Sequence, residues 1–302
     1  MHIERQSGAT GSGWVVETGS IAAVFVAVAM LTSTIVFSEP AIADMLMLGV
    51  IVAVPALGVA RFGPTTMLHT AAWLVFVGLG IAGTFISATF DTAIKHQLVT
   101  LYLLIGAFAT AGYIAGDPEP RFRLIMTCYT VACLIATLAA FVGYFHIVPS
   151  TYEVFTNYGR ARGTFKDPNV LGAFLTLPGL IVLQRMLAGR AMIGNGLLLL
   201  IMLAALFLSF SRGAWGIFAL STMVLMALTF ITTPSDGERL RIVLVAILGM
   251  VVLAGAVAAL LSIGKVADLF AERATLDQSY DLGRYGRFGR YALGADLALE
   301  HP

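Results

Sequence analysis

Charged residues are scarce in this sequence of 302 residues. Asp, Glu, Lys and Arg together make up 12% of the chain, whereas a soluble globular domain carries about 25%. Hydrophobic residues make up 59% of the chain, and the mean hydropathy is +0.90. So few charges could not cover the surface of a soluble domain, and so much apolar sequence excludes a disordered chain. The composition therefore predicts a polytopic membrane protein.

The chain also has little net charge, little cysteine and no metal-ligand pattern. A formal net charge of +1 gives no overall field that would attract nucleic acid, so we predict no nucleic-acid partner. Cys128 and Cys133 lie on different faces of one expected helix, which favours buried thiols over a disulfide or a metal pair. The five histidines are scattered, and the acidic residues form no cluster suited to Mg²⁺ or Ca²⁺. We therefore predict no metal and no other cofactor.

Long apolar runs dominate what is present. A bilayer core about 30 Å thick requires roughly 20 apolar residues of helix. Nine runs come close to this length, and they predict an all-α fold with about nine transmembrane helices over residues 21–263. A cytoplasmic tail is expected at residues 1–20 and a polar segment at 264–302. The runs are Ile21–Phe37, Ile42–Ala60, Met67–Thr89, Gln97–Ala115, Leu124–Val148, Val170–Met186, Leu197–Phe210, Ala214–Ile231 and Ile242–Ile263.

Two of these runs could form one broken span over residues 197–231. We predict two helices joined by a tight turn at Ser211–Gly213. In a single long helix Arg212 would lie near the membrane centre, at a cost of about 2.5–3.5 kcal/mol.

The cations in short loops favour a cytoplasmic N-terminus. In that orientation every predicted inner loop carries arginine, and the outer loops hold fewer cations. The inner segments hold Arg5, Arg61, Arg121, Arg123, Arg185, Arg190, Arg239 and Arg241, and the outer loops hold Lys95, Arg160, Arg162, Lys166 and Arg212. The outer cations are nevertheless more numerous than the rule leads one to expect. They indicate either contact with lipid headgroups and solvent or an anion site on the outer face.

The outer loop at residues 149–169 is the first candidate site. It carries Arg160, Arg162 and Lys166 within seven residues, and Gly163 would allow close approach of the backbone to a ligand. Pro168 can begin the next helix with Asn169 in its first turn. Helix N-termini and arginine side chains both favour phosphate. The alternative is a capped turn whose charges face water.

Arg212 is the second candidate. An arginine between two apolar helices is costly without an anionic partner, and no acidic residue lies nearby in the sequence. A functional role is therefore our first hypothesis. The alternative is an arginine that extends its charge to the interface beside Trp215.

The third candidate is the segment 283–291, in which arginine and aromatic residues each recur every three positions. Such a pattern is typical of single-stranded nucleic-acid binding, but the segment follows a span that should place it outside the cell membrane. An amphipathic helix lying on the membrane is the better alternative. The residues concerned are Arg284, Tyr285, Arg287, Phe288, Arg290 and Tyr291.

In this order, the three segments resemble the O-antigen ligase and Wzy-type polymerase family of bacterial envelope glycosyltransferases. The resemblance covers about residues 20–302, and Tyr291 stands where the family usually has tryptophan. It is carried by Arg162-Gly163-Thr164-Phe165 with Pro168-Asn169, by Ser211-Arg212-Gly213-Ala214, and by Arg287 and Tyr291 running into Leu299-Glu300-His301-Pro302.

The resemblance implies a multi-pass protein of the bacterial inner membrane whose active face is periplasmic. The donor would be a glycan on undecaprenyl pyrophosphate, and the acceptor a hydroxyl group on lipid A core or on another glycan. It implies catalytic roles for Arg212 and Arg287 at the pyrophosphate. Supporting cations would be Arg160, Arg162, Lys166 and Arg290, with Gly163, Pro168 and Asn169 ordering the loop.

Family members continue with a Gly-rich segment and a further histidine in an outer loop. We therefore expect residues 264–302 to be the start of a large periplasmic loop in a truncated chain, with the base that activates the acceptor beyond Pro302. The alternative function is a transporter or flippase for an anionic lipid-linked or small solute. The absence of charges in the middle of the predicted spans argues against transport.

Overall fold

The computed structural model describes residues 12–87, 89–274 and 286–300. It is an all-α membrane protein, as the composition predicts. Within the described residues, six helices are long and apolar enough to cross a membrane. Each predicted run overlaps an apolar helix, but three of these apolar helical stretches are only 10–17 residues long, so a count of nine spans is not confirmed. The three shorter ones are Thr18–Thr32, Ile42–Ala56 and Met192–Leu208.

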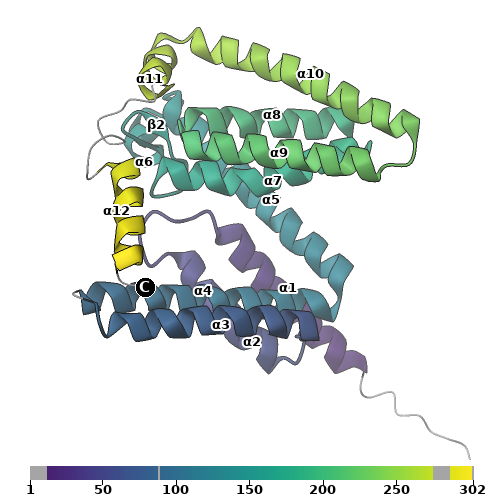
Figure 1. Cartoon of the computed structure of the whole chain (residues 1–302). Helices are drawn as coiled ribbons and strands as arrows, with labels where there is room; N and C mark the ends of the chain where they lie inside the picture. Colours follow the sequence, from purple (N-terminus) through teal and green to yellow (C-terminus); the bar gives the residue numbers. More distant parts are fainter. Residues whose placement is uncertain (1–11, 88, 275–285, 301–302) are drawn as a thin grey trace, which may run out of the picture. The chain divides into compact units, whose positions relative to one another are not determined.

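The chain forms two compact units, Met1–Ile135 and Ala136–Pro302. In the first unit α1 packs on α2, and both α2 and α3 pack on α4 (Figure 1). Small and β-branched side chains such as Ala22, Val26 and Val54 fill its core. Its helices are α1 (Ser12–Thr32), α2 (Ile42–Ala56), α3 (Pro64–Thr84), α4 (Phe90–Gly116) and the first part of α5 (Pro118–Tyr144).

An arginine closes one end of α4. Arg121 donates to the carbonyl of Tyr113 at 2.6 Å and to the carbonyl of Val59 at 2.7 Å. Its guanidinium also lies 4.6 Å from the centroid of the Tyr113 ring. The last carbonyl groups of a helix lack partners inside the helix and carry negative partial charge, so a cation is stabilised there.

The second unit is a bundle of apolar helices with a small hairpin at one end. Figure 1 shows α7, α8 and α9 side by side with α10 across them, and α6, β2 and α11 at one end. The elements after α5 are η1 (Pro149–Thr151), α6 (Tyr152–Phe155), β1 (Thr156–Asn157), β2 (Arg160–Ala161), α7 (Pro168–Leu187), α8 (Met192–Leu208), α9 (Arg212–Thr232), α10 (Asp236–Leu261), α11 (Gly264–Ala274) and α12 (Arg287–Glu300).

A short turn separates α8 from α9, which confirms two helices in place of one broken span. α8 ends at Leu208 and α9 begins at Arg212. Between them Phe210 adopts a left-handed conformation with φ of 47°. The Ser211 side chain then caps α9 by accepting from the backbone N–H of Ala214 at 3.4 Å. The reversal places Arg212 in the first turn of a new helix.

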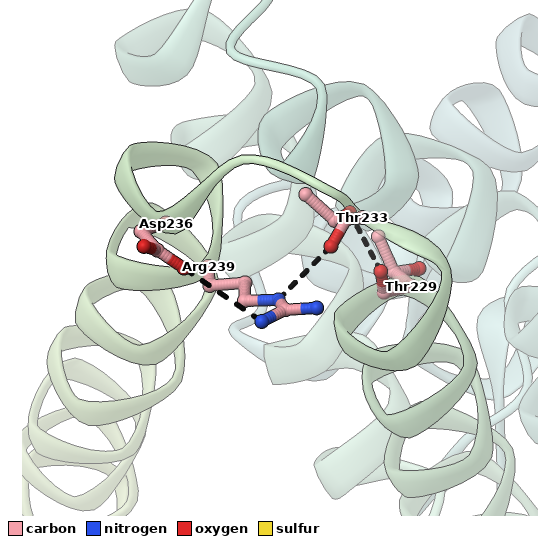
Figure 2. A network of polar contacts seen from close by, with 4 residues as sticks. All are labelled: Thr229, Thr233, Asp236 and Arg239. Carbon is pink, nitrogen blue, oxygen red and sulfur yellow. Dashed lines mark hydrogen bonds and ion pairs between the residues drawn. The ribbon is translucent and has the colours of Figure 1, made fainter.

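At the other end of this unit, arginines bind the carbonyl ends of helices. Figure 2 shows Arg239, which donates to the Thr233 carbonyl just after α9 at 2.9 Å and lies 3.7 Å from the Asp236 carboxylate. Arg241 donates to the carbonyl of Leu187, the last residue of α7, at 3.0 Å. Each positive charge therefore lies where the helix dipole favours it.

Close packing at Gly172 brings the N-terminal turns of α7 and α9 together. A Cβ atom added to Gly172 would lie 2.7 Å from the Cβ of Ala214 and 3.0 Å from the Ser209 hydroxyl oxygen. Both neighbours are short side chains, so they cannot move out of the way without a shift of the backbone. Only glycine lets the two helices approach so closely, so both helix starts lie beside each other.

We expect Gly172→Ala to lower stability by about 1–3 kcal/mol, because the added methyl group overpacks the contact between α7 and α9. Gly216→Ala in α9 is the matched control, since no atom lies within 4 Å of its added Cβ. That change should be neutral or stabilising by about 0.5–1 kcal/mol, since glycine weakens a helix. The midpoint of thermal unfolding in detergent measures both, and equal midpoints would contradict the packing.

Candidate functional site

The outer loop of the sequence analysis contains a short β-hairpin. β1 and β2 pair with Thr156 opposite Ala161 and Asn157 opposite Arg160. The turn between them has positive φ at Tyr158 (49°) and at Gly159 (72°). This hairpin places Arg160 at the start of β2, and β2 contacts both α7 and α8.

Arg160 links the loop to both neighbouring helix ends. Its Nε donates to the Ser209 carbonyl at 2.8 Å, and its Nη2 donates to Oδ1 of Asn169 at 2.8 Å. Ser209 follows the end of α8, and Asn169 lies in the first turn of α7. The first two candidate motifs, separated by about 40 residues of sequence, therefore meet at one end of the second unit.

Arg162 organises the loop itself. It donates to the carbonyls of Val154 at 3.1 Å, Glu153 at 3.1 Å and Lys166 at 3.3 Å. Two of these carbonyls belong to α6, where a cation satisfies acceptors at the end of a helix. The three contacts hold the chain before and after the hairpin together.

Gly163 makes the close backbone approach that its residue type suggested, but its neighbour is α5. Its φ is 56°, and an added Cβ would lie 2.5 Å from the Ala136 carbonyl oxygen. Nearby Phe165 is buried and packs on Phe174 with ring centroids 4.9 Å apart. These contacts anchor the loop on the helices beneath it.

α7 begins at Pro168, as the sequence predicts, with Asn169 in its first turn. The residue that caps this helix was not predicted. Asp167 precedes the helix, and its side chain accepts from the backbone N–H of Asn169 at 2.6 Å. An aspartate directly before proline and an apolar run is a recognisable helix start, so the signal was present.

Arg212 is the first residue of α9, half-buried, with no acidic residue in the first turn of that helix. The N-terminal end of a helix carries positive partial charge, so a cation there is disfavoured, whereas an anion is stabilised by about 0.3–1 kcal/mol. This placement is opposite to that of Arg121, Arg239 and Arg241, which bind carbonyl ends.

Positive charge therefore gathers where α7 and α9 begin. The N-terminal ends of α7 and α9 lie beside each other. The loop before α7 and the first residue of α9 together carry four cations and only two carboxylates, those of Glu153 and Asp167. We call the four cations the cationic site: Arg160, Arg162, Lys166 and Arg212. Lys166 and Asn169 are exposed, and Arg160, Arg162 and Arg212 are half-buried. Such an arrangement can bind a multiply charged anion such as phosphate.

An amphipathic helix that sequence reasoning missed packs beside the cationic site. Val266 of α11 is fully buried, and Phe270 stacks on Phe207 and on Trp215 with centroids 5.7 and 6.2 Å apart. Trp215 in turn donates from its indole Nε1 to the Leu206 carbonyl at 2.9 Å. Trp215 therefore takes part in an aromatic cluster that joins α8, α9 and α11.

The third candidate segment is only partly described. Arg287 begins α12, but its side chain lies outside the described part of the structure, as do Arg284, Tyr285 and His301. Arg290 is exposed, and Tyr291 is 69% exposed. The expected convergence of Arg287 with Arg212 stays a prediction.

Comparisons of the chain with protein-family models, curated protein sequences and solved structures find no match. The resemblance noted from the motifs therefore stays a prediction. Among the described residues there is no group of three His, Cys, Asp or Glu side chains that could hold a metal ion.

We expect Arg160→Gln to loosen the hairpin and the first turn of α7, because it removes a charged donor from the Ser209 carbonyl and from Asn169. Hydrogen bonds to charged groups contribute about 1.5–3 kcal/mol each. Amide hydrogen exchange over residues 156–170 should therefore accelerate. Arg123→Gln is the control, because its ion pair with Glu119 is 70% and 83% exposed and should contribute little. An unchanged rate of amide exchange in Arg160→Gln would contradict a stabilising role for the Arg160 hydrogen bonds.

Proposed function

We propose that this protein is a membrane glycosyltransferase of the O-antigen ligase or polymerase type. It would move a glycan from undecaprenyl pyrophosphate to a hydroxyl group of lipid A core or of another glycan. The observation that carries the proposal is the position of Arg212, which begins α9 beside the start of α7, where the loop that precedes α7 carries three further cations. An anionic substrate would be stabilised by this positive charge and by the N-terminal ends of both helices.

The reaction would place most new charge on the leaving group. The acceptor hydroxyl oxygen attacks the anomeric carbon and gives its proton to a general base, while the bond from that carbon to the diphosphate oxygen breaks. The electron pair of that bond goes to undecaprenyl pyrophosphate, whose negative charge therefore grows in the transition state. Fixed guanidinium groups in a partly dry site stabilise this growing charge without having to reorganise.

The contacts suggest a division of roles within the cationic site. Arg212 is the proposed catalytic residue, and Lys166, which is exposed, would support it at the diphosphate. Arg160 and Arg162 each donate to backbone carbonyls, so they would mainly hold the hairpin in position. The motif resemblance adds Arg287 as a second catalytic residue and Arg290 as a supporting cation. Gly163, Pro168 and Asn169 would order the loop.

We expect both Arg212→Ala and Arg212→Lys to abolish glycan transfer while the protein still inserts. Alanine removes the charge, and lysine lacks the planar fork of donors that matches a phosphate group. Loss of an electrostatic donor of this kind typically lowers the rate by about 10²–10³-fold. The measurement is the glycan ladder from cells whose only copy of the gene carries the change.

Arg190→Ala is the control for this experiment, because Arg190 is exposed and lies just after α7, at the opposite end of that helix. Its ladder should be normal at equal protein level. A normal ladder from either Arg212 variant would remove this residue from the mechanism. Movement of a lipid-linked glycan across sealed vesicles, with no new glycosidic bond, would favour the transporter instead.

The proposal also requires the cationic site to face the periplasm of the bacterial inner membrane. A reporter enzyme that is active only in the periplasm, fused after Gly264, should be active, because α10 ends at Leu261 at the end of the unit where α8 ends and α9 begins. The same reporter fused after Thr233, at the other end of α9, should be inactive. The reverse pair of results would place the site in the cytoplasm and contradict the proposal.

A further inference from the structure

α11 contacts both segments that carry the arginines of the cationic site. A Cβ atom added to Gly159 would lie 3.2 Å from Cδ1 of Leu269, so α11 touches the hairpin turn directly before Arg160. From the same face of α11, Phe270 stacks on Trp215, which lies three residues after Arg212. α11 is therefore a neighbour of the site, although its sequence is far from the motifs.

Arg273 projects from the packed face of α11. Successive residues of a helix are rotated by about 100°, so residues three and four positions apart share a face. Arg273 lies three residues after Phe270 and four after Leu269, and all three lie on the same side as buried Val266. Its side chain is only 21% exposed. Arg273 thus lies on the face of α11 whose Leu269 and Phe270 pack on the segments that form the site.

The Arg273 guanidinium has an unused donor. Its Nε is buried and donates no hydrogen bond to any residue that the structure describes. Its ion pair with the Glu272 carboxylate has an N···O distance of 3.6 Å, beyond hydrogen-bond length, and that carboxylate is 62% exposed. A buried cationic donor without an acceptor costs more than an ordinary unmade hydrogen bond. An anionic oxygen brought by a ligand would satisfy it.

We propose that Arg273 is a further binding residue of the cationic site and donates through Nε to a phosphate oxygen of a lipid-borne ligand. This inference rests on the proposed function, under which the ligand is the diphosphate of the donor. An arginine presents Nε and one Nη in parallel to two phosphate oxygens, whereas lysine cannot. The diphosphate would then lie between α11 and the N-termini of α7 and α9.

The test is a titration of the full chain in nanodiscs of neutral phosphatidylcholine with farnesyl diphosphate, a short soluble probe. Arg273→Gln should raise the Kd by about 10- to 100-fold, the loss expected for one charge-assisted hydrogen bond. Lys265→Gln is the matched control, because it removes the same charge from the exposed side of α11. Its Kd should stay within about twofold of the wild-type value, since exposed charges are screened.

A second arm separates the two sources of phosphate. In nanodiscs that contain phosphatidylglycerol, native mass spectrometry counts the lipids retained by each variant. If Arg273→Gln loses retained phosphatidylglycerol and binds farnesyl diphosphate normally, the phosphate contact stands and its source is a membrane lipid. If neither ligand is affected, the role of Arg273 is overturned, while diphosphate binding by the wild type leaves the proposed function standing. A wild type that binds no diphosphate overturns the proposed function itself.

A measurement on the wild-type protein covers the case in which Arg273→Gln does not fold. Phenylglyoxal modifies arginine side chains, and mass spectrometry of the Arg273 peptide reports the rate. Farnesyl diphosphate or phosphatidylglycerol should slow the modification of Arg273 and leave that of exposed Arg190 unchanged. Equal rates at Arg273 with and without both ligands would overturn the inference.

Discussion

The direction of the helix dipoles is the constraint on which the second unit depends. At one end of the bundle, Arg239 and Arg241 donate to the last carbonyls of α9 and α7, where positive charge is stabilised. At the other end, Arg212 opens α9 where the same dipole opposes it. The two helix starts and the Arg212 side chain therefore add positive charge to the same end of the bundle. An anion can be stabilised there by both.

Packing makes this electrostatic arrangement possible. Gly172 allows α7 and α9 to approach so closely that their N-termini act on the same space, and Arg160 ties the hairpin across the turn between α8 and α9. The aromatic stack of Phe207, Trp215 and Phe270 then fixes α11 beside that turn. Each contact joins residues that are distant in sequence. The site is therefore a property of the folded bundle and not of any single motif.

The sequence predicted what local patterns determine. Apolar runs located the helices, Pro168 marked the start of α7, and the cost of a central arginine correctly separated α8 from α9 at Arg212. The sequence could not place Arg160 on the Ser209 carbonyl, because that contact spans 49 residues and follows no periodicity. The docking of α11 was missed for the same reason: its face is amphipathic, but only the fold shows what covers it. The helix α2 is shorter than its run, because α2 ends at Ala56 and the apolar residues that follow it form a turn.

The same geometry bears on whether the site would catalyse or only transport. A transporter binds its ligand on one side of the membrane and must release it on the other side. Tight binding of the ligand slows this release. An enzyme gains only from contacts that strengthen as the reaction proceeds. In the proposed reaction the diphosphate would become more negative as the bond to it breaks. A half-buried arginine at the start of α9 would then interact more strongly with that charge than with the starting ester. The backbone of Arg212 is held at the start of a helix, so stabilising this charge would require no rearrangement of that helix. A rigid cluster of this kind suits a reaction that generates charge at one fixed point, and it is poorly suited to passing an anion along a pathway.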